Sequence, residues 1–235
     1  MVQQGSLESG GSVARQGRLT FRHPTAPTSP TDETGQFDLF GVEGAPPAAM
    51  YVPTAAKGEA LRLVVMLHGA GGSAGSGLGL LRREADRHRL LLLAPKSTGR
   101  TWDVIRGGYG PDVRNLDRLL AEVATEFPLR GCTIGGFSDG ASYAISLGLA
   151  NGDVFDSVIA FSPGFQAALL ENGRPRIFVS HGTNDSVLPI DRCSRRLVPA
   201  LERVGYDVTF HEFEGQHTVP AAVRKKAMAW LREVE

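Results

Sequence analysis

Cysteine, excess charge and long apolar runs are all scarce in this chain of 235 residues. The two cysteines, Cys132 and Cys193, lie far apart, which argues against a disulfide framework and against a metal site. The 25 Lys and Arg residues balance 25 Asp and Glu residues, so a protein that coats nucleic acid or binds membranes through a basic patch is not expected. No apolar run approaches the length of a bilayer span, and we therefore expect no stable membrane insertion.

A secretory signal is also missing from the start of the sequence. Residues 1–6 (MVQQGS) lack the basic residues and the following apolar stretch that such a signal requires. We therefore expect a cytoplasmic location. A secreted or periplasmic location is the alternative for a chain from which a signal has been removed.

Glycine, in contrast, is abundant. The 29 glycines make up about 12% of the chain against a usual value of roughly 7%. Six lie in residues 69–79 and four in residues 131–140, where close approaches and unusual backbone conformations are therefore expected. Residues 1–17 are rich in Gly, Ser and Gln without periodicity, and they predict a flexible N-terminal segment. Residues 18–235 suffice for a single domain with a full-sized core.

Short apolar runs alternate with helical patterns over most of the chain. Near-continuous apolar runs are typical of parallel strands covered on both faces, and apolar residues at three- and four-residue spacing are typical of amphipathic helices. The alternation predicts an α/β fold with a mostly parallel, doubly wound sheet and antiparallel N-terminal strands. The expected strands are 18–22, 36–40, 48–52, 61–67, 90–94, 132–137, 157–161, 176–180 and 207–213, and the expected helices cover 111–127, 141–150, 197–204 and 223–234.

The most specific motif is the sequence GFSDG at residues 136–140, which closes a predicted buried strand and precedes a predicted helix. The Gly-x-Ser-x-Gly spacing allows a sharp strand-to-helix turn that exposes the serine hydroxyl above the sheet edge. The N-terminus of the helix favours negative charge that develops nearby. Ser138 is therefore a candidate nucleophile.

A serine nucleophile needs a base, and the base needs a carboxylate to orient it. Asp185 and His217 both lie in loops that follow later predicted strands, where open α/β sheets build their sites. The order Ser138, Asp185, His217 is the order of an α/β-hydrolase triad. The less well placed alternatives are Asp191 and Asp207 for the acid, and His68, His181 and His211 for the base, of which His68 and His181 are expected to brace loops.

A glycine-rich turn, LHGAGG at residues 67–72, follows another predicted strand. Such a turn can point backbone N–H groups at an oxyanion. The N–H groups of Ala70 and Asp139 are the candidate donors, and neither depends on its own side chain.

Taken together, the segments LHGAGG, GFSDG, HGTNDSVLP and GQHTVP resemble the four signatures of the phospholipase/carboxylesterase branch of the α/β-hydrolases, as found in bacterial serine esterases. The resemblance extends from about Leu61 to the C-terminus. It implies hydrolysis of carboxylic esters, and in some members of thioesters and lysophospholipids, without a cofactor or a metal. Asp139 and Ala141 depart from the Gln and the second Gly that members often carry.

Two aromatic residues are candidates for the substrate pocket. Residues 94–103 resemble the loop that flanks the pocket in bacterial members. The resemblance places Trp102 in the wall of that pocket, with Tyr109 nearby. The alternative is that both are ordinary surface aromatics.

Only residues 162–175 separate two predicted strands at the position where many lipases of this fold carry a lid domain. This connection is too short for such a domain, so an open site that accepts short to medium, bulky or polymeric esters is expected. The sequence thus predicts a serine carboxylesterase, monomeric or homodimeric, whose partners are small-molecule or polymeric esters and not nucleic acid. The alternatives are a polyester depolymerase or feruloyl/acetyl-xylan esterase, a thioesterase or lysophospholipase, and a non-catalytic binding protein on a hydrolase fold.

Overall fold

A computed structural model describes residues 13–23, 26–54 and 59–233 of the chain. These residues form one eight-stranded sheet with the order β1-β2-β4-β3-β5-β6-β7-β8. Strand β2 runs antiparallel to β1 and β4, and the pairs from β4 through β3 to β8 are parallel. The prediction of a mostly parallel sheet with antiparallel N-terminal strands is confirmed. The strands are β1 (Gly35–Leu39), β2 (Ala48–Val52), β3 (Leu61–Leu67), β4 (Leu90–Ala94), β5 (Leu129–Phe137), β6 (Ser157–Phe161), β7 (Arg176–Gly182) and β8 (Val208–Phe213).

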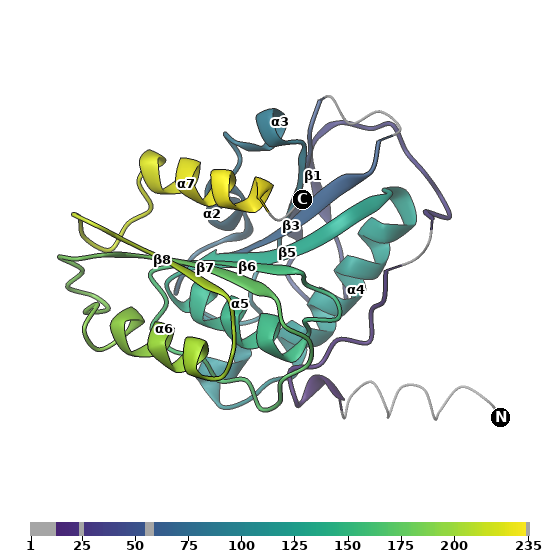
Figure 1. The fold of residues 1–235 in the computed structure, drawn as a ribbon. Coiled ribbons are helices and arrows are strands. Elements are labelled where there is room, and N and C mark those ends of the chain that lie inside the picture. The colour runs from purple at the N-terminus through teal and green to yellow at the C-terminus, as the bar shows by residue number, and fades with distance from the viewer. Residues whose placement is uncertain (1–12, 24–25, 55–58, 234–235) are drawn as a thin grey trace.

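Helices cover both faces of the sheet (Figure 1). One face carries α2 (Ala74–Gly79), α3 (Ala85–His88) and α7 (Ala221–Arg232), whose apolar residues form one core cluster with the sheet. The other face carries α4 (Pro111–Glu126), α5 (Asp139–Ala150) and α6 (Ser194–Arg203), which belong to a second and larger cluster. A short 3-10 helix, η1 (Asp103–Arg106), precedes α4.

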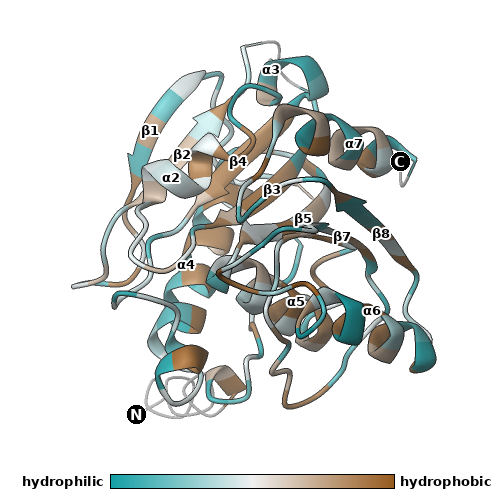
Figure 2. Cartoon of the chain, turned by 90° about the vertical axis from the view of Figure 1, so that its left-hand side faces the viewer, coloured by the Kyte–Doolittle hydropathy of each residue, from teal (hydrophilic) through white to brown (hydrophobic). Residues whose placement is uncertain are grey.

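The hydropathy of each element matches its place in these layers. Strands β3 and β4 are apolar along most of their length, whereas α4 carries both apolar and polar residues (Figure 2). Every residue of β3 and β4 is buried, as expected for strands covered on both faces. Helix α5 is buried at all but its first position and packs so closely on β6 that a side chain at Gly148 would collide with Val158. The sheet and α5 therefore form a rigid base beneath the turn at Ser138.

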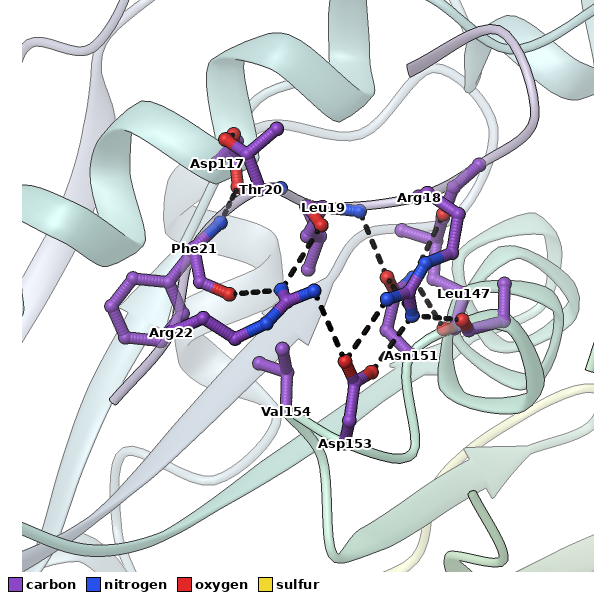
Figure 3. Close-up of polar contacts among 12 residues, drawn as sticks. Arg18, Leu19, Thr20, Phe21, Arg22, Asp117, Leu147, Asn151, Asp153 and Val154 are labelled. Carbon is purple, nitrogen blue, oxygen red and sulfur yellow. Dashed lines mark hydrogen bonds and ion pairs between the residues drawn. The ribbon is translucent and has the colours of Figure 1, made fainter. Parts of the chain in front are cut away.

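The predicted strand at residues 18–22 is not a strand, and this prediction is wrong. The segment is held by side chains of the α4 and α5 region (Figure 3). Asn151 Oδ1 accepts the Leu19 N–H at 2.8 Å, and Asp117 accepts the N–H groups of Thr20 and Phe21 at 2.9 and 2.7 Å. Because these side chains satisfy its backbone, the segment needs no neighbouring strand.

The packed part of the chain begins before the expected boundary at Arg18. Residues 13–17 form a turn of helix, Ala14 is buried, and the Gly17 carbonyl accepts a hydrogen bond of 2.8 Å from Asn151 Nδ2. Residues 13–17 are thus packed against the rest of the described chain. The remainder of the expected flexible segment, residues 1–12, lies outside the described residues.

The length of the connection from β6 to β7 predicts that no lid domain is inserted there. Residues 162–175 contain neither helix nor strand. No lid domain is inserted at this position. Within the described ranges, none of the helices combines the length and the apolar character needed to cross a membrane.

Candidate active site

Ser138 occupies the sharp turn between β5 and α5. Its backbone has φ 57° and ψ −122°, a conformation that non-glycine residues rarely adopt. The turn is fixed by a hydrogen bond of 2.9 Å from the Ser138 N–H to the Phe161 carbonyl at the end of β6. The side chain lies at the carboxyl edge of the sheet, and the residue is only 9% exposed.

Two glycines permit the chain to pass this turn. A Cβ atom on Gly136 would lie 2.5 Å from backbone atoms of Gly140, and a Cβ atom on Gly140 would lie 2.5 Å from the His68 carbonyl oxygen. No side chain fits at either position without displacing backbone. The glycines of the motif therefore allow α5 to start directly against the end of β3.

The structure brings Ser138, His217 and Asp185 together from three loops. His217 Nε2 lies 2.9 Å from Ser138 Oγ, and His217 Nδ1 lies 2.6 Å from Asp185 Oδ2. Asp185 follows β7, and His217 follows β8. The chain of contacts therefore runs from hydroxyl to imidazole to carboxylate.

The Asp185 carboxylate is held by backbone groups as well as by His217. Its Oδ1 accepts the N–H groups of Val187 at 2.9 Å and Leu188 at 2.8 Å. Burial alone would raise the pKa of Asp185, but these hydrogen bonds and the contact with His217 outweigh it and hold that pKa below its ordinary value. Asp185 is therefore ionised at neutral pH.

The alternative acids and bases lie elsewhere. Asp191 pairs with Arg195 and Asp207 pairs with Arg176, in both cases at 2.8 Å and on the surface. His211 lies in β8, where its Nδ1 is 3.4 Å from Lys226 Nζ.

His181 and His68 brace loops. His181 lies behind Asp185, with its Nε2 2.8 Å from the Leu188 carbonyl and 3.2 Å from Asp185 Oδ2. Its Nδ1 lies 2.6 Å from Ser194 Oγ, and burial lowers its pKa. His68 Nδ1 lies 2.7 Å from the Gly69 carbonyl oxygen, in the turn after β3. Neither imidazole contacts Ser138 Oγ.

The two candidate oxyanion donors flank Ser138. A Cβ atom on Gly69 would lie 3.3 Å from Ser138 Cβ, so the turn that contains Ala70 passes beside the nucleophile. Asp139 is the first residue of α5, where an N–H group has no acceptor within its own helix. Among the described residues, neither the Ala70 nor the Asp139 N–H donates to another group. The Asp139 carboxylate accepts a hydrogen bond of 2.7 Å from Thr101 Oγ1.

Trp102 and Tyr109 lie in the core, which differs from their expected place in the pocket wall. Trp102 is 2% exposed and Tyr109 is 6% exposed. The Trp102 indole donates to the His68 carbonyl at 2.9 Å and stacks on Tyr143, and the Tyr109 hydroxyl donates to the Ala167 carbonyl at 2.9 Å. Both aromatic side chains therefore support the loops around Ser138 from the core side.

Sequence reasoning missed a pair of buried carboxylates, Asp103 and Asp112, close to Trp102 and Tyr109 in the sequence. Asp103 accepts hydrogen bonds from the Tyr143 hydroxyl at 2.8 Å and from the N–H groups of Gly110 and Asp112 at 2.8 and 2.9 Å. Asp112 accepts the N–H groups of Thr98 and Asp103 at 2.7 and 2.8 Å. The sequence around Asp103 and Asp112 does not distinguish them from acidic residues that face solvent. Their hydrogen-bond donors are not their immediate neighbours in the sequence.

The sheet order and the strand-to-helix turn at Ser138 define the α/β-hydrolase fold. A scan against protein-family models gave no match, and a search of curated proteins gave none. Among solved structures, the chain is similar to esterase PE8, with 26% identity, a TM-score of 0.66, and coverage of 81% of this chain and 98% of that chain. It is also similar to a carboxylesterase from Bacillus cereus (18% identity, TM-score 0.62, 87% and 96% covered) and to the S-formylglutathione hydrolase FrmB from Staphylococcus aureus (16% identity, TM-score 0.66, 87% and 100% covered). Two of these three solved structures are thus esterases, and the third is a hydrolase.

Proposed function

We propose that the protein is a serine carboxylesterase that acts through an acyl-enzyme. The observation that carries this proposal is the contact chain from Ser138 through His217 to Asp185, next to two backbone N–H groups that donate to no described residue. The esterases among the similar structures support the same class of reaction.

In the first half-reaction, Ser138 Oγ attacks the ester carbonyl carbon while its proton passes to His217 Nε2. The carbonyl π electrons move onto oxygen, and the N–H groups of Ala70 and Asp139 stabilise that charge. The tetrahedral intermediate then expels the alcohol, to which His217 returns the proton. Water repeats these steps on the acyl-enzyme and releases the carboxylic acid.

Asp185 gives His217 the geometry that both half-reactions need. Its Oδ2 accepts a hydrogen bond from Nδ1–H, which keeps the proton on that nitrogen and leaves the lone pair of Nε2 directed at Ser138. The negative charge also stabilises the imidazolium that forms during attack. The two backbone N–H groups on Oδ1 keep the carboxylate in this orientation.

The loops around the triad favour an apolar, neutral substrate in an open site. Phe165 follows β6 and Val187 follows β7, and these two side chains are 37% and 63% exposed. They lie on connections that leave the same sheet edge as Ser138. No lid domain is inserted between β6 and β7, where residues 162–175 form neither helix nor strand.

A panel of p-nitrophenyl esters from about C2 to C16, together with a polyester emulsion, tests this proposal. We expect kcat/KM to be highest for short to medium acyl chains, without a jump in rate above the solubility limit of the longer esters, because no lid domain is inserted between β6 and β7. Rates measured on both sides of that limit provide the check. A marked rise above it would contradict the proposed open site, and absence of turnover on every ester would refute the esterase assignment.

The value of kcat/KM is also expected to fall as the pH is lowered, because the binding of one proton inactivates the site. Neutral His217 is required to accept the Ser138 proton. The pKa of Asp185 is held below its ordinary value, so this carboxylate stays ionised to lower pH, and burial lowers the pKa values of His68 and His181, which favours their neutral forms. A plot of log kcat/KM between about pH 5 and 8 should therefore reach a slope of one on its acid side. A slope of two would show that a second group controls the reaction.

A further inference from the structure

The peptide between Gly69 and Ala70 is fixed by two donors on its carbonyl side. The Gly69 carbonyl oxygen lies 2.7 Å from His68 Nδ1 and accepts the Gly72 N–H at 3.0 Å. A trans peptide is planar, so its C=O and N–H point in opposite directions. The group that fixes the Gly69 carbonyl therefore also sets the direction of the Ala70 N–H.

The hydrogen-bond partners of His68 determine which of its nitrogens carries the proton. The Ser97 N–H donates to His68 Nε2 at 3.1 Å, so this nitrogen presents a lone pair. The proton of the neutral ring is then on Nδ1, where it is donated to the Gly69 carbonyl. His68 is 1% exposed, and burial lowers its pKa, which favours this neutral form.

Trp102 holds the main chain of the same residue. Its indole N–H donates to the His68 carbonyl at 2.9 Å, and the two ring centroids lie 4.8 Å apart. Trp102 in turn stacks on Tyr143 with centroids 5.1 Å apart. Helix α5 thus supports the backbone and the imidazole of His68 through Tyr143 and Trp102.

We propose that His68 is a positioning residue for the oxyanion site: its Nδ1–H fixes the Gly69–Ala70 peptide so that the Ala70 N–H faces the developing oxyanion. This inference rests on the proposed esterase function. His68 itself touches neither Ser138 Oγ nor the substrate carbonyl in this arrangement, and it acts through the peptide that follows it.

Two variants of similar size test the proposal. His68→Asn retains an N–H donor near the position of Nδ1, and His68→Leu removes it. We expect His68→Leu to lower kcat on p-nitrophenyl acetate by about tenfold to a hundredfold, less than complete loss of an oxyanion donor, with KM within about twofold. His68→Asn should recover most of that loss.

A trifluoromethyl ketone provides a second measurement that reports on the oxyanion itself. Ser138 Oγ adds to its carbonyl carbon, the carbonyl oxygen becomes the hemiketal oxyanion, and the serine proton passes to His217. Affinity for this ketone should fall in His68→Leu by the same factor as kcat and recover in His68→Asn. Trp102→Phe keeps the aromatic stack but removes the donor to the His68 carbonyl, and it should change kcat and ketone affinity in the same direction with KM unchanged.

Circular dichroism and thermal unfolding of each variant separate positioning from folding. Wild-type kcat and ketone affinity in a folded His68→Leu variant would overturn the inference. Equal losses in the Leu and Asn variants, in parallel with a lower thermal midpoint, would also overturn it, since they would indicate a structural role. If the wild-type protein neither hydrolyses esters nor binds the ketone, the proposed function itself fails, and this result is distinct from the other two.

Discussion

Replacement of Ser138 by alanine is expected to lower turnover of p-nitrophenyl acetate by about 10⁴- to 10⁶-fold and to leave the fold intact. The change removes the oxygen that forms the acyl-enzyme, and among the described residues no other hydroxyl is hydrogen-bonded to His217 Nε2. The effect on stability should be small because serine and alanine bear a similar cost at the φ of 57°. The comparison variant Ser138→Gly should be equally inactive yet slightly more stable, since glycine adopts this φ without strain.

Covalent labelling complements this kinetic experiment. A fluorophosphonate probe should label the wild-type protein at Ser138 and should label neither variant. Thermal unfolding of all three proteins checks that the fold is preserved. Full activity in Ser138→Ala would disprove the nucleophile assignment, and a folded wild-type protein that resists the probe would favour a non-catalytic binding protein on the hydrolase fold.

The order of the site residues could be predicted from the sequence because each follows a strand of a parallel sheet. Ser138, Asp185 and His217 come after β5, β7 and β8, and the carboxyl ends of parallel strands meet at one edge. Once the strands were recognised from their apolar runs, proximity followed from topology. The distances of 2.9 and 2.6 Å could not be predicted in this way, since they depend on loop conformations.

The failures share a physical cause, which is a partner distant in the sequence. The segment at residues 18–22 has the pattern of a strand, but Asn151 and Asp117 bind its backbone. The resemblance of residues 94–103 to a pocket-flanking loop predicts Trp102 in the pocket wall. Its indole instead finds the His68 carbonyl and the Tyr143 ring. A short sequence pattern cannot predict a hydrogen-bond or stacking partner that lies far away in the sequence.

The abundance of glycine is explained in part by the same close approach of segments at the active site. Gly69, Gly136 and Gly140 all lie where the end of β3 meets the turn at Ser138. At Gly140, two effects of a methyl group oppose each other. Helix propensity favours alanine over glycine by about 1 kcal/mol in a helix interior. The packing against β3 disfavours it, because the added Cβ would collide with the carbonyl oxygens of Leu67 and His68.

We expect packing to dominate at this position, because backbone carbonyls cannot rotate away as a flexible side chain can. Gly140→Ala should therefore lose about 3 kcal/mol or more of unfolding free energy, which corresponds to a fall of roughly 10 °C in Tm for a domain of this size. Esterase turnover should fall with it, since α5 can accept the methyl group only by moving away from the turn that carries Ala70.

Gly79→Ala is the matched control for this prediction. Gly79 also lies in a helix, α2, but an added Cβ there meets nothing within 4 Å. Propensity alone then applies, so this variant should be as stable as the wild type or more stable by up to about 1 kcal/mol, with unchanged turnover. Thermal unfolding and p-nitrophenyl acetate hydrolysis, measured on the same preparations of both variants, test this prediction. If Gly140→Ala matched Gly79→Ala in both, the contact between α5 and β3 would not be what positions Ser138 beside Ala70.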